Sequence, residues 1–117
     1  MTLPYDPTLH PYVQAVLAMK GFDVVLLDLR GLASFADTFI ICSGRSHRQV
    51  SAIAEFIVQN LKKEGISPLG VEGLREGHWV LLDYADVVIH VFYEPIRIFY
   101  DLEGLWSDAK RIEVSGM

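Results

Sequence analysis

The chain has 117 residues, of which 51% are hydrophobic, and a formal net charge of −5. This length suits one domain with a packed core, and the apolar content argues against a disordered chain. Phosphate backbones attract basic surfaces, so the acidic balance predicts little direct nucleic-acid binding and favours a protein partner.

Membrane, secreted and disulfide-stabilised proteins are disfavoured by the sequence. No apolar run approaches the ~20 residues of a membrane-spanning helix, so we expect no membrane association. Residues 1–6 lack the basic flank and apolar block of a signal peptide, which predicts a cytoplasmic location. Cys42 is the only cysteine, and the apolar run around it, TFIICSG, predicts a buried thiol rather than a disulfide or a metal ligand.

The first part of the chain is predicted to alternate between helix and strand. Pro7 and Pro11 suit a helix start and Gly21 suits its end, which predicts a helix from about residue 8 or 11 to residue 20. Two mostly apolar runs are predicted strands, and they cover residues 22–29 and 38–44.

The next segment carries the clearest helix signal. Ser46 and Gln49 have the spacing of a capping box. Beyond them, apolar residues recur at helical spacing and form one stripe, which consists of Val50, Ile53, Ala54, Ile57 and Leu61. Gly65 suits the end of this helix.

The last part of the chain is richer in strands. We predict a short strand within SPLGVEG, a β-hairpin within GHWVLLDYADVVIHVFY and an edge strand at KRIEV. Pro95 ends the hairpin, because proline cannot donate to a strand ladder. One short helix is predicted from Ile98, Phe99, Leu102, Leu105 and Trp106. The fold class is therefore α/β, a single domain with a mixed β-sheet flanked by helices, in which residues 1–21 supply an N-terminal helix and residues 22–117 the α/β domain.

The hairpin has two unlike faces if Ala85 and Asp86 form its turn, because side chains alternate along a strand. The apolar face must cover the core and consists of Val80, Leu82, Tyr84, Val87, Ile89 and Val91. The mixed face consists of Trp79, Leu81, Asp83, Val88, His90 and Phe92. Two interpretations of the mixed face remain open. Either a helix covers it and Asp83 pairs with His90, or part of it stays open for a partner, which its aromatic content favours.

Enzymatic interpretations do not assemble a complete set of groups. Arg45, Ser46 and Arg48 form a candidate anion-binding site at a helix start, which keeps a nucleotide- or phosphate-handling enzyme open as the alternative function. Capping explains Ser46 better than nucleophilic catalysis, since GRSHR lacks the second glycine of a nucleophile elbow. The four histidines lack metal-ligand spacing, and Asp83 with Asp86 does not ensure the convergence that two-metal chemistry needs. We therefore predict no metal, no cofactor and no catalytic residue.

Several separated motifs occur in the order of a known family. They resemble the ribosomal silencing factor family, RsfS, also called Iojap, in the segments LDLRGLASFADTFIICSGRSHRQVSAIAEFI, GVEG, GHWVLLDYADVVIHVF and RIFYDLEGLWSDA. The resemblance runs from about residue 22 to residue 109. The chain departs from the family at Thr38, where an aromatic residue is usual, and at Ala85, where glycine is usual.

The resemblance implies a topology like that of nucleotidyltransferases without their catalytic residues. In agreement, no acidic residue occurs between Gly44 and Glu55. The resemblance further implies a homodimer that binds the large ribosomal subunit through its protein number fourteen. Binding there blocks the small subunit and represses translation under nutrient limitation.

The resemblance also implies a set of partner contacts, which are Trp79, Leu81, Asp83, Tyr84, Asp86, His90, Tyr100 and Glu103. Alternation places Tyr84 on the core-facing side of the hairpin, unlike Trp79 and His90. Leu102 and Trp106 belong to the same motif, but a role in the core of the last helix is the simpler interpretation. An acidic binder would be attracted to a basic ribosomal protein and held away from the surrounding RNA.

Overall fold

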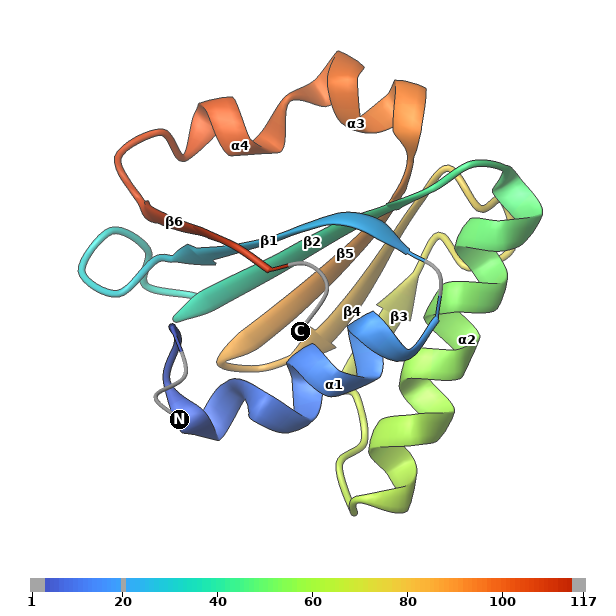
Figure 1. The fold of residues 1–117 in the computed structure, drawn as a ribbon, viewed down its shortest axis with the longest axis horizontal. Helices are drawn as coiled ribbons and strands as arrows, with labels where there is room; N and C mark the ends of the chain where they lie inside the picture. Colours follow the sequence, from blue (N-terminus) through green and yellow to red (C-terminus); the bar gives the residue numbers. More distant parts are fainter. Residues whose placement is uncertain (1–3, 20, 115–117) are drawn as a thin grey trace.

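The computed structural model describes residues 4–19 and 21–114. Its elements are η1 (Pro7–Leu9), α1 (His10–Ala18), β1 (Phe22–Asp28), β2 (Thr38–Gly44), α2 (His47–Lys63), β3 (Gly70–Glu72), β4 (Trp79–Tyr84), β5 (Val87–Tyr93), α3 (Glu94–Tyr100), α4 (Leu102–Leu105) and β6 (Lys110–Glu113). Within these residues one six-stranded mixed sheet has the order β3-β4-β5-β2-β1-β6. α1 and α2 lie on one face of the sheet and α3 and α4 on the other (Figure 1). The predicted fold class is confirmed.

The centre of the sheet is buried on both faces. β2 pairs in parallel with β5 and antiparallel with β1, and every residue of β2 is buried. A strand of this kind needs a cover on each side, since its apolar side chains point both ways. β3 and β6 are the edge strands.

The first cover consists of α1 and α2. The predicted apolar stripe of α2, Val50, Ile53, Ala54, Ile57 and Leu61, is fully buried against the sheet. The Ser46 hydroxyl accepts a hydrogen bond from the backbone N–H of Gln49 at 3.0 Å, which confirms the predicted cap. α1 ends at Ala18. Its predicted end at residue 20 lies outside the described residues, as do residues 1–3 and 115–117 of the predicted domain limits.

The second cover consists of α3 and α4, whereas the sequence predicted one final helix. Pro95 ends β5 and also lies in the first turn of α3, where its fixed φ suits helix geometry. The helical path then breaks at Asp101, which has a φ of 47°. The Asp101 carboxylate accepts from the backbone N–H of Gly104 at 3.2 Å and so starts α4. Two short helices therefore replace the single one predicted.

The hairpin has the predicted register. Tyr84 pairs with Val87, and Trp79 pairs with Phe92. The apolar face joins the core under α1 and α2, and the mixed face joins the core under α3 and α4. Ala85 has a φ of 69°, a left-handed conformation that glycine adopts at less cost. The resemblance leads us to expect glycine at this position, and the observed conformation is one that favours glycine.

Ala85→Gly is expected to raise the free energy of unfolding by about 1 kcal/mol, because it removes the Cβ from a left-handed turn position. The matched control is Ala52→Gly on the exposed face of α2, which should lower the same quantity by about 1 kcal/mol. Urea denaturation of both variants checks the pair. Equal destabilisation by the two glycines would contradict the turn geometry.

Candidate protein interface

The mixed face of the hairpin is partly covered by α3. The Trp79 ring stacks on Phe92, with ring centroids 4.7 Å apart, and lies 5.2 Å from the ring of Tyr100 on α3. Phe92 is fully buried, whereas Trp79 and Leu81 are half-buried. The covering helix therefore closes over part of this face only. Tyr100, which is exposed, and the half-buried Trp79 lie at the border of the covered part.

His90 is an interior residue with only 3% of its surface exposed. Its Nδ1 accepts a hydrogen bond from the Trp79 indole N–H at 3.0 Å, so the imidazole carries its proton on Nε2. Nε2 has no hydrogen-bond partner within the described part of the chain. Burial lowers the pKa of His90 to about 4, which keeps the ring neutral near pH 7.

Asp83 does not pair with His90, so that part of the covered-face interpretation is wrong. The Asp83 carboxylate instead accepts from the backbone N–H of Ala85 at 2.8 Å and supports the turn. Asp83 remains half-buried on the side of the sheet that carries Trp79. Its charge thus lies on the same side of the sheet as Trp79, toward the turn end of β4.

Tyr84 and Asp86 lie apart from the other predicted contacts. Tyr84 is buried on the opposite face, 5.5 Å from the ring of Tyr12 in α1. Burial, with a smaller contribution from Tyr12, raises the pKa of Tyr84 to about 12. Asp86 is exposed at the turn, where its backbone carbonyl accepts from the N–H groups of Asp37 and Thr38. The eight predicted contacts therefore do not form one surface in the free chain.

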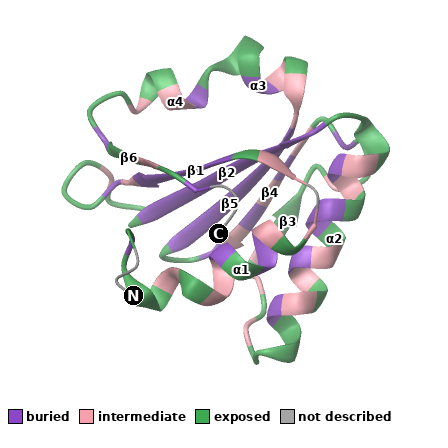
Figure 2. Cartoon of the chain, viewed as in Figure 1, coloured by how far each residue is buried: buried purple, intermediate pink, exposed green. Residues whose placement is uncertain are grey.

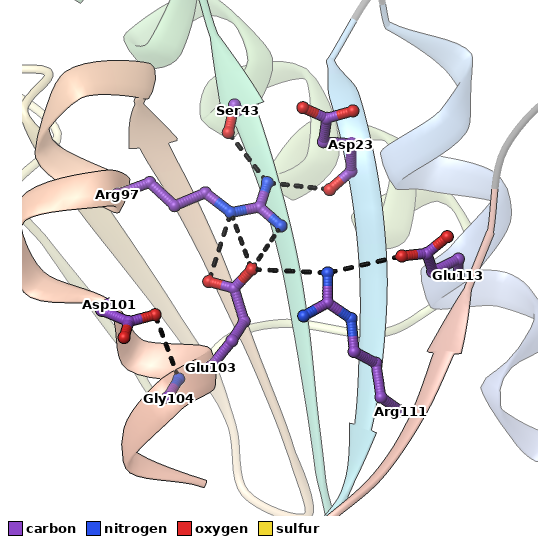
Figure 3. Close-up of polar contacts among 8 residues, drawn as sticks. All are labelled: Asp23, Ser43, Arg97, Asp101, Glu103, Gly104, Arg111 and Glu113. Atoms are coloured by element: carbon purple, nitrogen blue, oxygen red, sulfur yellow. Dashed lines mark hydrogen bonds and ion pairs between the residues drawn. The ribbon is translucent and has the colours of Figure 1, made fainter. Parts of the chain in front are cut away.

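A buried arginine ties α3 and α4 to the sheet (Figure 3). The Arg97 guanidinium donates to the Ser43 hydroxyl and to the backbone carbonyl of Asp23, both at 2.8 Å. It also pairs with the Glu103 carboxylate at 3.0 Å. Asp23 lies at a bulge in β1 with a φ of 52°, and a bulge disrupts the strand ladder locally, which leaves this carbonyl available to the guanidinium.

Glu103 forms ion pairs within this chain. Its side chain is 14% exposed and is shared between Arg97 and, at 3.9 Å, Arg111. Sequence reasoning missed Arg97 altogether. The available signal was a lone cation inside the apolar run IRIFY with an acidic residue six positions later.

The outward side of α3 and α4 is strongly apolar. Ile98 is 73% exposed, Phe99 78% and Leu105 76%, and both helices turn this side to solvent (Figure 2). The sequence predicted that these three residues lie in one final helix, and the structure divides them between α3 and α4. Leu102 is buried and Trp106 half-buried, as the simpler interpretation expected.

The candidate anion site consists of exposed side chains with other partners. The Ser46 hydroxyl caps α2, and the Arg45 guanidinium lies 4.4 Å from the centre of the Phe22 ring. Arg48 is exposed on the first turn of α2. Capping and packing thus explain Ser46 and Arg45 without a ligand.

A cavity of about 580 Å³ lies between the N-terminal segment and the sheet. Its charged lining consists of Asp6, Asp28, Asp37, Asp86, Arg30 and Lys110. Arg30 is paired with Asp28 at 2.8 Å and holds the pKa of that carboxyl below its usual value. The remaining acidic groups would repel a phosphate.

Residues 4–19 and 21–114 contain neither a cluster of metal ligands nor a membrane-spanning helix. Among these residues, no three His, Cys, Asp or Glu side chains come together as a metal-binding group. No helix there has both the length and the apolar character needed to cross a membrane.

Comparison with known proteins decides the family. Residues 4–117 match the family described as ribosomal silencing factor during starvation, RsfS. The chain belongs to this family. The RsfS of Halalkalibacterium halodurans is 42% identical over 105 residues, which cover 90% of each chain. The RsfS of Bacillus subtilis is 46% identical over 90 residues, which cover 77% of this chain and 76% of the relative.

A solved structure has the same fold. The crystal structure of a Chromobacterium violaceum protein superposes with a TM-score of 0.81 at 37% identity, and the match covers 92% of this chain and 89% of that one. The RsfS relatives are named for ribosome silencing and not for a reaction. Their names accord with a chain whose sequence offers no complete catalytic set.

The buried His90 predicts a pH-dependent stability. Its pKa is about 6.5 when unfolded and about 4 when folded, so the unfolded chain binds one more proton between these values. The free energy of unfolding should therefore fall by about 1.4 kcal/mol for each pH unit from pH 6.5 down to pH 4.

In the variant His90→Phe, the free energy of unfolding should depend less steeply on pH between pH 6.5 and pH 4. This holds whatever the effect of the substitution on stability at pH 7. Urea denaturation of both chains at several pH values measures it. Carboxylates contribute equally to the two chains, so identical slopes would show that His90 is not held neutral.

Proposed function

We infer that this protein is a ribosomal silencing factor that binds the large ribosomal subunit through its protein number fourteen. Bound there, it blocks the small subunit sterically and represses translation under nutrient limitation, in the cytoplasm and without catalysis. The free protein forms a homodimer. The observation that supports this function most is the match of residues 4–117 to the family, together with a half-open aromatic and acidic surface on the same domain.

The surface has the composition of a protein-binding site. Trp79 and Tyr100 lie side by side where α3 meets β4, and Asp83 is half-buried on the same side of the sheet. Aromatic residues are enriched at the centres of protein interfaces and carry a large share of binding energy. The acidic side chain complements a basic ribosomal protein, and the net charge of −5 opposes contact with RNA.

Burial narrows the set of contacts that this function can use. His90 and Tyr84 are enclosed by the fold, so their role is to position the residues around them. Trp79 contributes its exposed rim, and the rest of its ring packs on Phe92. Tyr100 and Asp83 are therefore the residues whose change tests binding without opening the core.

The double variant Tyr100→Ala with Asp83→Asn should weaken large-subunit binding by about 30-fold or more, since one lost aromatic anchor can cost about 2 kcal/mol. Asparagine keeps the oxygen that accepts from Ala85, so the turn survives. Co-sedimentation with purified large subunits through a sucrose gradient measures the effect.

The control is Glu55→Gln on the exposed side of α2, which removes the same charge from the other face of the sheet. Its binding should equal that of the unaltered chain. Undiminished binding by the double variant would reject this surface as the contact.

A further inference from the structure

The cavity between the N-terminal segment and the sheet has walls from several elements. Its floor contains one row of paired residues that crosses β5, β2, β1 and β6, and the row consists of Val87, Thr38, Asp28 and Lys110. Residues of η1 and Tyr12 of α1 also line it. Its volume of about 580 Å³ lies within the range of small-molecule sites in proteins.

Thr38 places a buried hydroxyl group at this cavity. The residue is 7% exposed and lines the cavity. Ile40 and Cys42 of the same strand belong to the core under α1 and α2, and side chains alternate along a strand, so Thr38 points to that side of the sheet. Its hydroxyl has no hydrogen-bond partner within residues 4–19 and 21–114. Since buried polar groups are nearly always hydrogen-bonded, this hydroxyl points to a polar group of a ligand.

The charged groups of the lining leave an excess of two negative charges. They are four carboxylates and two cations, namely Asp6, Asp28, Asp37 and Asp86 with Arg30 and Lys110. Arg30 is paired with Asp28 at 2.8 Å. Asp37 and Asp86 are neighbours, because the Asp37 backbone N–H donates to the Asp86 carbonyl at 2.8 Å. Neither carboxylate forms an ion pair in the part of the chain that the structure describes, so both can receive a cation.

The positions of the carboxylates favour an extended organic cation over a metal ion. A bare divalent ion needs several oxygen ligands around one point, and among the described residues no three acidic groups converge in that way. The lining also includes the apolar side chains of Leu26, Val87 and Ile112 and the ring of Tyr12. Burial raises the pKa of Tyr12 and the charge of Asp86 adds to that rise, so the charge acts on this ring. Tyrosine rings attract ammonium groups, and apolar walls accept methylene groups.

We propose that the cavity binds a small aliphatic polyamine, in which ammonium groups are separated by methylene groups. One ammonium group pairs with Asp37 and Asp86, the methylene groups lie along the apolar wall, and the Thr38 hydroxyl accepts a hydrogen bond from an amine. The inference goes beyond the proposed function and does not depend on it, because the cavity lies on the face of the sheet opposite to α3 and α4.

Equilibrium dialysis against spermidine tests the proposal, at about 0.15 M salt so that attraction between distant surface charges is screened. The unaltered chain should bind spermidine saturably, with one molecule per chain. The double variant Asp37→Asn with Asp86→Asn should bind it about five- to thirtyfold more weakly, because two ion pairs are lost. Both side chains are exposed, so urea denaturation should show that the variant is folded.

The matched control is the double variant Glu55→Gln with Glu72→Gln. It removes the same number of charges from exposed residues that do not line the cavity. Its affinity for spermidine should equal that of the unaltered chain. A control that weakens binding as much as the asparagine variant would overturn the proposal, since the attraction would then come from the overall charge.

Thr38→Phe separates the cavity from the charges at its border. The substitution keeps every charge, and its ring occupies the space beside β2, where an aromatic residue suits a strand. A folded Thr38→Phe chain should no longer bind spermidine saturably. Undiminished binding by this variant, undiminished binding by the asparagine variant, or no saturable binding by the unaltered chain would each overturn the proposal. Each of these results would leave the proposed function standing, because none concerns the large ribosomal subunit.

Discussion

The architecture depends on one ion pair that closes the second face of the sheet. β2 is buried along its whole length, so the sheet must be covered on both sides. The first cover is the seventeen-residue helix α2 with α1; the second consists of two short helices. Short helices are marginal without tertiary contacts, and Arg97 supplies them by joining α3 and α4 to β1 and β2. Removing one partner of such a pair leaves a buried charge, which is costly.

This arrangement explains why the candidate interface is divided between strand and helix. The hairpin supplies Trp79 and Asp83, but His90 and Phe92 are buried on the same face. What remains accessible is the border where Trp79 meets Tyr100 and the outer side of the helices. The surface that can meet a partner is thus displaced from the strand ribbon toward α3 and α4.

The elements that sequence reasoning predicted well are those with local causes. Strand alternation fixed both faces of the hairpin, and the register follows from the turn at Ala85 and Asp86. The capping box and the apolar stripe defined α2 because both signals lie within the helix itself. The positive φ of Ala85 is not encoded by its own residue type, because alanine adopts this conformation at a cost that glycine avoids.

The elements that sequence reasoning missed depend on contacts between residues that are far apart in the sequence. Arg97 bonds to Ser43, 54 residues away, and to Asp23, 74 residues away, and no local pattern encodes such partners. The break at Asp101 depends on a left-handed backbone that aspartate adopts when its side chain caps the next helix. Without knowledge of these contacts, the local pattern placed Ile98, Phe99 and Leu105 in one continuous helix. Their exposure follows from the direction in which Arg97 holds α3.

Amide hydrogen exchange of the free protein and of its complex with the large ribosomal subunit tests the central claim most directly. The account predicts that binding slows exchange in residues 94–106 and in β4, while α2 on the other face exchanges as it does in the free protein. Slowed exchange along α2, with residues 94–106 unchanged, would contradict it.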